Sequence, residues 1–345
     1  MAVLTFKSTE YQKFPPILKE YATNATVIKG NSEKTVCEYL LDLRTFFRFF
    51  KNRADAVNMT KSEFEEISIL DVDLELVRSV RQSDILDFLI FSYSRENGAS
   101  SRMRKLSALR SFFKFMVVKK GYLDVDPTAN VEAPKKAKTL PKYMTYEECV
   151  SLLNTVRGDT ESPTNIRDFA IIVLFLNTGI RLSELVGLNL QSISSDLTVM
   201  KVKGKGNKER IVYLNDMAQR ALKEYLQVRL DPKYINTSDN ALFLSSRDQR
   251  ISVKTVQWMV NKYFEMAGLG YKGLSVHKLR HTAATLMYQT GRVDIRVLKD
   301  ILGHEQLNTT QIYTHVVDQN IKAAVSNNPL ADIKIKKPII SDSED

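Results

Sequence analysis

The sequence has few residues of the kinds that cross-link or anchor a chain. Only two of its 345 residues are cysteine, Cys37 and Cys149. Two thiols cannot build a disulfide framework or a cysteine-rich zinc site, so both classes are excluded. The best candidate for a membrane span, Ile171–Leu176, is far too short to cross a bilayer. The first residues lack the basic segment and apolar core of a signal peptide, so we expect a cytoplasmic protein with no membrane partner.

The composition is that of a folded protein with an excess of positive charge. Apolar residues make up 43% and charged residues 26% of the chain, which excludes disorder over most of its length. Lys and Arg number 50 and Asp and Glu 40, so the formal net charge is +10. This charge favours an anionic partner but does not indicate any chemistry. The length predicts about two domains.

The positive charge is concentrated in separate segments. Residues 55–87 are rich in acidic side chains, whereas residues 101–120 contain several cations and no acidic residue. Further basic runs occupy residues 135–142 and 201–210. A single basic run is as often a solvated helix face, but several on one basic chain favour a track for the phosphate backbone of a nucleic acid. We expect DNA contacts from Arg102, Arg104, Lys105, Arg110, Lys135, Lys136, Lys138, Lys208 and Arg210.

Apolar spacing predicts a helical domain over residues 1–130. Ser32 precedes a helix whose apolar residues recur every three or four positions. A second helix covers residues 85–93, and Asn97-Gly98 is typical of a helix C-terminus. A third helix follows Ser101, with a buried apolar stripe and most of the basic run on its other side. The first 30 residues and the longer segment 51–80 give no clear assignment.

A change of composition marks the domain boundary. Residues 131–144 contain two prolines, four lysines and little apolar periodicity, which is typical of a linker. Thr145 with Glu148 three residues later predicts a capping box, so a helix opens the second domain there. We expect that domain over residues 145–330. Residues 331–345 form an acidic-ended tail that we expect to be disordered.

The second domain is predicted to be mostly helical with one small sheet. A nearly all-apolar helix covers residues 168–177 and ends at Thr178-Gly179. Alternation over residues 197–214, around glycines at 204 and 206, predicts a β-hairpin. From Lys254 onward the pattern returns to helices, interrupted by glycines. The fold class is therefore mostly α with a small antiparallel sheet.

All four histidines lie between residues 277 and 315, which raises the question of a metal. His277 and His281 are four residues apart, as in zinc-binding helices. However, Lys278 and Arg280 stand between them, and cations raise the cost of binding a divalent ion. We therefore predict no metal site here. An anion suits the segment better, because His277 and Arg280 share a helix face and a guanidinium offers paired donors to phosphate oxygens.

Other groups suited to an anion lie elsewhere in the chain. Arg181 follows Thr178-Gly179 at a helix start, where unpaired backbone N–H groups also favour an anion. Lys205 lies at the hairpin tip, where a flexible ammonium could enter a site. Tyr313 lies nine residues after His304. Each of these has an ordinary structural explanation when taken alone, so their joint presence is the informative observation.

Five segments in order carry a family resemblance: Thr-Gly-Ile-Arg-Leu-Ser-Glu-Leu at 178–185, Gly-Lys-Gly-Asn-Lys-Glu-Arg at 204–210, His-Lys-Leu-Arg-His-Thr at 277–282, Leu-Gly-His at 302–304 and Ile-Tyr-Thr-His-Val at 312–316. They resemble the tyrosine recombinases, and within them the bacterial Xer-type enzymes. Weaker matches occur at residues 107–113, 126–129 and 140–142. Residues 51–80 are longer than the Xer pattern.

The resemblance implies a two-domain architecture, in which a helical core-binding domain precedes a mixed α/β catalytic domain. It implies Tyr313 as nucleophile, Arg181 and Arg280 as phosphate ligands and Lys205 as general acid. It also implies His277 and His304 in the phosphate pocket, supported by Glu184. Lys208 competes with Lys205 for the acid role, but the family motif places the acid between the two glycines. No metal, ATP or other cofactor is implied.

The resemblance further implies a site-specific DNA recombinase that forms a 3′-phosphotyrosyl intermediate and a Holliday junction. Four protomers would assemble on two DNA sites through a helix at residues 319–330, with an accessory regulator as a further partner. Resolution of chromosome or plasmid dimers is the favoured role. Integration of a phage or conjugative element uses the same chemistry, and a non-enzymatic helical DNA-binding protein would leave Tyr313 and the paired arginines unexplained.

Overall fold

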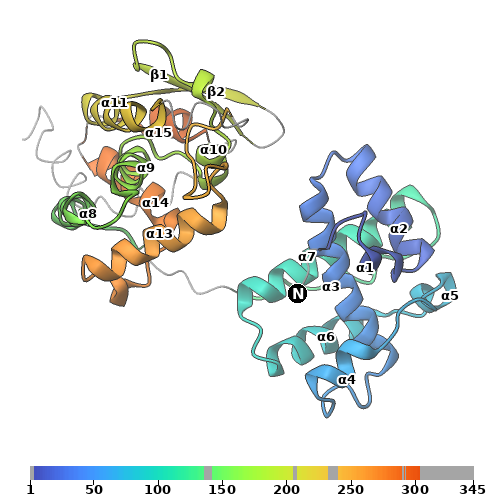
Figure 1. Cartoon of the computed structure of the whole chain (residues 1–345). Helices are drawn as coiled ribbons and strands as arrows, with labels where there is room; N and C mark the ends of the chain where they lie inside the picture. Colours follow the sequence, from blue (N-terminus) through green and yellow to red (C-terminus); the bar gives the residue numbers. More distant parts are fainter. Residues whose placement is uncertain are drawn as a thin grey trace, which may run out of the picture. The chain divides into compact units, whose positions relative to one another are not determined.

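A computed structural model of the chain describes residues 4–135, 142–204, 208–231, 240–289, 291 and 293–303. The chain divides into two compact units, Met1–Thr139 and Leu140–Asp345 (Figure 1). The boundary between them falls inside the segment 131–144 that composition predicts as a linker. Within the described ranges, no helix is long and apolar enough to cross a membrane.

The first unit is entirely helical in its described residues. Its α-helices are α1 (Thr9–Gln12), α2 (Pro16–Thr23), α3 (Glu33–Lys51), α4 (Lys61–Glu66), α5 (Leu74–Arg78), α6 (Gln82–Ser94) and α7 (Ala99–Lys114), with π-helical turns at Asn24–Ile28 and Phe115–Lys119. Helix α3 lies at the centre and packs against α2, α6 and α7. The predicted start of α3 is confirmed, because the Ser32 hydroxyl accepts the backbone N–H of Thr35 at 3.3 Å.

Phenylalanines fill the space between α3, α6 and α7. Phe46, Phe88 and Phe113 are fully buried, and the ring of Phe46 meets the other two edge to face, with centroids 5.3 and 6.4 Å away. Phe47 and Phe112 extend the cluster with a further edge-to-face contact at 5.9 Å. Each large aromatic ring removes about 150–250 Å² of surface from water, so this cluster dominates the stability of the unit.

Two details of the first unit differ from the sequence-based expectation. Asn97-Gly98 does not end α6: Glu96 takes the left-handed conformation with φ of 58°, and Gly98 is the N-cap of α7. Residues 51–80, which gave no assignment, contain α4 and α5. These helices have only six and five residues, too few for a 3.6-residue period to be recognised.

The second unit is built around one buried helix. Its elements are α8 (Tyr146–Gly158), α9 (Asn165–Thr178), α10 (Leu182–Val186), β1 (Val199–Lys203), β2 (Glu209–Tyr213), α11 (Asp216–Arg229), α13 (Val253–Met266), α14 (Val276–Gln289) and α15 (Ile295–Leu302), with 3₁₀ turns at Leu190–Ser192 and Gly270–Lys272. Helix α9 is surrounded by α8, α11 and α14 (Figure 1), which confirms the predicted buried helix. The Thr145–Glu148 capping box at the start of α8 is also confirmed.

The predicted hairpin is confirmed as an antiparallel pair. Val199 pairs with Tyr213 and Lys203 with Glu209, so the loop 204–208 connects the strands. On β2 the exposed fraction alternates: Val212 is buried, Ile211 and Tyr213 are exposed, and Arg210 lies on the same side as Val212. Because side chains alternate across a strand, Arg210 points toward the core of the unit.

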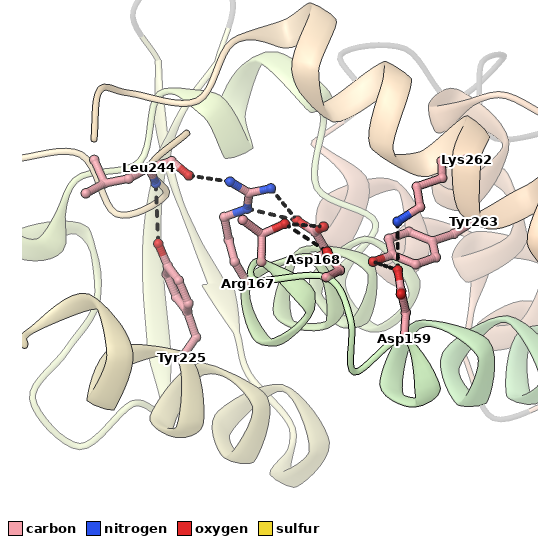
Figure 2. Close-up of polar contacts among 9 residues, drawn as sticks. Asp159, Arg167, Asp168, Tyr225, Leu244, Lys262 and Tyr263 are labelled. Atoms are coloured by element: carbon pink, nitrogen blue, oxygen red, sulfur yellow. Dashed lines mark hydrogen bonds and ion pairs between the residues drawn. The ribbon is translucent and has the colours of Figure 1, made fainter. Parts of the chain in front are cut away.

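A buried ion pair fixes the start of α9 (Figure 2). The Arg167 guanidinium donates to the Asp168 carboxylate at 2.7 and 2.8 Å and to the backbone carbonyl of Leu244 at 2.7 Å. Thr164 donates a further hydrogen bond to Asp168 at 3.0 Å. Burial raises the pKa of Asp168, and the charge of Arg167 opposes this shift. The network joins α9 to the segment that precedes α13.

A second polar contact in Figure 2 joins α13 to the end of α8. Lys262 and the hydroxyl of Tyr263 both donate to the Asp159 carboxylate, at 2.7 and 3.1 Å. Lys262 thereby lowers the pKa of Asp159. This contact ties α13 to the end of α8, and the Arg167–Asp168 pair ties the start of α9 to Leu244.

Candidate active site

Arg181 lies at a turn between two helices. Gly179 ends α9 with φ of +62°, and Arg181 is the N-cap of α10. Its Nη1 donates to Glu184 Oε1 at 2.9 Å, and its backbone N–H donates to Glu184 Oε2, also at 2.9 Å. The expectation that free backbone N–H groups here attract an anion is therefore wrong for Arg181, because Glu184 occupies its N–H. Its guanidinium remains about a third exposed, with a side-chain exposure of 35%.

Arg280 reaches the same place from α14. It is 7% exposed, and its Nη1 donates to the carbonyl of Gly179 at 2.5 Å. Its Nη2 donates to the carbonyl of Leu302 at 2.6 Å, while Arg181 Nη2 donates to the next carbonyl, that of Gly303, at 2.7 Å. Two arginines almost 100 residues apart in the sequence thus converge on adjacent carbonyls at the end of α15.

Glu184 joins a third arginine to this cluster. The carboxylate is 2% exposed and accepts a hydrogen bond from Arg210 Nη2 at 3.0 Å. Arg210 was predicted to contact DNA, and the structure instead places it inward, with a side-chain exposure of 18%. Burial lowers the pKa of the Arg210 guanidinium, and the charge of Glu184 opposes this shift. Sequence reasoning missed this role, although Arg210 shares its strand face with Val212.

Two glycines allow the arginines to come so close. A Cβ on Gly303, whose φ is +61°, would lie 2.6 Å from Arg210 Nε. A Cβ on Gly179 would lie 2.8 Å from Leu302 Cδ2 and 3.8 Å from Arg280 Cγ. Both positions combine a left-handed backbone with no space for a side chain, so only glycine fits. The sequence showed both glycines as helix breaks but not as close packing positions.

We predict that Gly179→Ala lowers the free energy of unfolding of the second unit by about 2 kcal/mol, since a left-handed alanine costs about 1–2 kcal/mol and Leu302 must also move. Urea unfolding followed by the fluorescence of Trp258, the single tryptophan, measures this. Gly268→Ala is the matched control, because Gly268 has φ of +70° and open space around its Cβ position. Equal losses in both variants would contradict a role for the Leu302 contact.

The two described histidines of α14 differ in environment. His277 is exposed, whereas His281 is partly buried. Burial, together with the charges of Lys278 and Arg280, lowers the pKa of His281 to about 4. His281 is therefore neutral at pH 7 and adds no charge to the site. Among the described residues no group of His, Cys, Asp or Glu is arranged to hold a metal ion.

Three predicted catalytic residues, Lys205, His304 and Tyr313, lie outside the described residues, as does the predicted helix at 319–330. The residues that directly precede two of them are described. Gly204 lies against the cluster, since a Cβ there would be 3.4 Å from Glu184 Oε1, and Gly303 contacts Arg210. In the sequence, each of these two glycines is followed directly by a predicted catalytic residue. The roles of these three residues stay predictions.

Two basic residues of α7 form ion pairs within the protein that the sequence did not indicate. Lys105, expected on the exposed side of the helix, is 7% exposed and forms a 3.1 Å ion pair with Asp42. That placement was wrong, because Asp42 on α3 is itself 2% exposed and draws the ammonium inward. Arg104, with 41% exposure, forms ion pairs with Asp42 at 3.0 Å and Glu38 at 2.8 Å. Lys105 thus links α7 to α3.

Of the remaining residues predicted to contact DNA, some bind groups within the protein and others are exposed. Arg102 lies 4.8 Å from the ring centre of Tyr93 and donates to the carbonyl of Asn97 at 3.1 Å. Arg110 donates to the carbonyl of Val131. Lys135 and Lys208 are exposed, whereas Lys136 and Lys138 lie outside the described residues.

Comparison with known proteins identifies the family. The model of the phage integrase family matches residues 142–320, more than half of the chain. The chain belongs to this family. It is 47% identical to tyrosine recombinase XerC of Caldanaerobacter subterraneus subsp. tengcongensis, over 93% of this chain and 89% of that protein. A second XerC, from Thermodesulfovibrio yellowstonii, is 36% identical over 84% of this chain and 87% of that protein. The chain is a Xer-type tyrosine recombinase, a site-specific DNA recombination enzyme.

A solved recombinase shares the fold. The XerH site-specific recombinase, crystallised bound to a palindromic difH substrate in a post-cleavage complex, matches with a TM-score of 0.65. The match covers 90% of this chain and 83% of that chain, at 22% identity. The predicted class, mostly helical with a small antiparallel sheet in a tyrosine-recombinase architecture, is confirmed.

Proposed function

We propose that this recombinase resolves dimers of chromosomes or plasmids in the cytoplasm, by cutting and rejoining two copies of one DNA site through 3′-phosphotyrosyl intermediates and a Holliday junction. The observation that carries the cutting and rejoining chemistry is the convergence of Arg181 and Arg280 on adjacent carbonyls at the end of α15. Guanidinium groups held this way present donors in fixed directions, which suits a phosphate. The support for dimer resolution comes from the XerC relatives.

The reaction requires stabilisation of charge at one phosphate. The Tyr313 oxygen attacks phosphorus, a tyrosyl–phosphate bond forms, and the bond to the 5′ oxygen breaks. Negative charge builds on the non-bridging oxygens, where the donors of Arg181 and Arg280 act on it. Lys205 gives a proton to the leaving oxygen, a step of the kind that supplies about 10²–10⁴-fold in rate.

Rejoining is the same step in reverse. The 5′ hydroxyl of the partner strand attacks the phosphorus of the phosphotyrosyl linkage. A new phosphodiester bond forms, and the bond to the tyrosine oxygen breaks. One phosphodiester is exchanged for another, so the chemistry consumes no ATP. The unperturbed pKa of tyrosine is about 10, and a cationic pocket of arginines and histidines favours its phenolate form. His277 and His304 complete this pocket in the proposal.

Double-stranded DNA and further protomers are the proposed partners. The helical first unit and the lysine-rich segment 131–144 would grip the duplex, while residues 319–330 would dock on a neighbouring protomer in an assembly of four on two sites. Support comes from the XerH structure, which holds a DNA substrate. An accessory regulator that selects the active pair of protomers is part of the same proposal.

We expect Arg102→Gln and Arg104→Gln to change which base pairs the protein prefers in its site. Arg102 lies beside the ring of Tyr93, and both ion pairs of Arg104 use Nη1 of a side chain that is 41% exposed. The other nitrogens of these guanidiniums are the donors that would contact a guanine edge. Binding to a panel of site variants at several salt concentrations measures this. Uniform weakening with a smaller salt dependence would mean phosphate contact only.

The role in dimer resolution is tested by mapping the DNA that becomes covalently attached to the protein in cells. The expected result is one short sequence on the chromosome or a resident plasmid. The XerC relatives support this outcome over integration of a phage or conjugative element. Adducts at the ends of an integrated element would instead assign the integrase role, and a complete absence of adducts would contradict the proposed chemistry.

A further inference from the structure

Arg210 has an environment that stability alone does not explain. It lies on the inward face of β2, next to the buried Val212 and opposite the buried Val202 on β1. Its Nη2 reaches Glu184, but its Nε and Nη1 are buried without a hydrogen-bond partner in the described part of the chain. Buried donors without acceptors reduce stability, and an apolar side chain would suit this face better.

The charge of Arg210 makes the net charge of the cluster around Arg181 and Glu184 positive. Glu184 Oε1 accepts from Arg181 Nη1, and Oε2 accepts from both the Arg181 N–H and Arg210 Nη2. Without Arg210, one buried carboxylate would neutralise the charge of Arg181. With it, two positive charges face one negative charge, so the cluster keeps a net positive charge for an anion.

Arg210 also supports the turn that holds Arg181 from the other side. Its Nε and Cδ lie 2.6 and 2.8 Å from the position that a Cβ on Gly303 would take. The carbonyl of the same Gly303 accepts the Arg181 Nη2 hydrogen bond. Arg210 therefore contacts both of the groups, Glu184 and Gly303, that fix the direction of the Arg181 guanidinium.

We infer that Arg210 is a positioning residue for strand cleavage. It orients Glu184 and the Gly303 turn around Arg181 and keeps the cluster positively charged, so that Arg181 meets the scissile phosphate in one orientation. The guanidinium itself is covered and does not touch the DNA. This inference rests on the proposed role of Arg181 as a phosphate ligand.

The test is single-turnover cleavage of a fluorescein-labelled, nicked duplex that carries the sequence recovered from covalent adducts in cells. We expect Arg210→Gln to lower the cleavage rate constant at saturating DNA about 10-fold, with a DNA dissociation constant within about 3-fold of wild type. Arg210→Lys keeps the charge without the planar fork, so its rate should lie between the two. In an Arg181→Ala background, Arg210→Gln should change the rate less than about 2-fold, because the residue it acts through is gone.

Arg229→Gln is the matched control, because Arg229 is a buried arginine of the same unit that donates to the carbonyl of Ala241. It should lower the melting temperature without lowering the cleavage rate constant. A wild-type rate in Arg210→Gln, or multiplying effects in the double variant, would overturn the inference. If Arg210→Gln fails to fold, either a wild-type rate in folded Arg210→Lys or multiplying effects of Arg210→Lys and Arg181→Ala would overturn it. Failure of the wild-type protein to form any adduct would instead contradict the proposed function itself.

Discussion

Tyr313→Phe is expected to abolish the covalent protein–DNA adduct and leave DNA binding unchanged. The substitution removes only the hydroxyl oxygen that forms the bond to phosphorus in the proposed reaction. The measurement is a denaturing gel of the protein mixed with a labelled, nicked duplex, combined with a gel-shift assay of the same mixture. We expect a shifted complex of normal affinity and no adduct band.

Tyr271→Phe is a suitable control for this experiment. Tyr271 belongs to the same unit and is 79% exposed, so loss of its hydroxyl disturbs no packing. It should form adducts at the wild-type rate. An adduct that persists in Tyr313→Phe would remove Tyr313 from the nucleophile role and would direct attention to another hydroxyl of the chain.

Arg181→Ala and Arg280→Ala should each lower the rate of cleavage by at least about 10², the effect of removing one preorganised donor to the transition state. Both guanidiniums point to the end of α15, and together they supply positive charge that opposes the negative charge developing on the phosphate oxygens. Single-turnover rates at saturating DNA isolate this effect from binding. A rate close to that of the wild type for either variant would exclude that residue from the phosphate site.

The Arg280 variant needs a separate measure of folding, because Arg280 also joins α9 to α15 through Gly179 and Leu302. Loss of two buried hydrogen bonds costs about 1–3 kcal/mol in total, which a melting curve will show. Arg280→Lys keeps the charge at this position but not the paired donors. We expect it to fold more stably than Arg280→Ala and still cleave at least about 10-fold more slowly than wild type, since one ammonium replaces a planar fork.

Much of the secondary structure could be predicted from the sequence, and the exceptions have a common cause. Helix α3 has an apolar period over many residues, α9 is a nearly all-apolar segment, and the hairpin has clear alternation around its glycines. The misses were short helices such as α4 and α5, which pack through one or two side chains each. The end of α6 was misplaced because Glu96, not a glycine, adopts the left-handed conformation.

The candidate site was predictable in part. Motif order pointed to Arg181, Glu184 and Arg280, and the structure places these three together. It could not be read from the sequence that Arg210 belongs with them, because a basic residue near a basic hairpin is equally consistent with a DNA contact. For the same reason Lys105 was placed on the surface, although Asp42 holds it in the interior.

By itself, the sequence indicated a tyrosine recombinase, through motifs in fixed order that resemble this family and without the cysteine framework or long apolar runs that other classes need. The catalytic roles of the residues in these motifs stay predictions. Only the tertiary structure decided which basic side chains are exposed and which form ion pairs with buried carboxylates. The physical reason is that a charge pattern along the chain does not specify its partners. The buried carboxylates of Asp42 and Glu184 pair with the basic side chains that helix and strand packing places next to them.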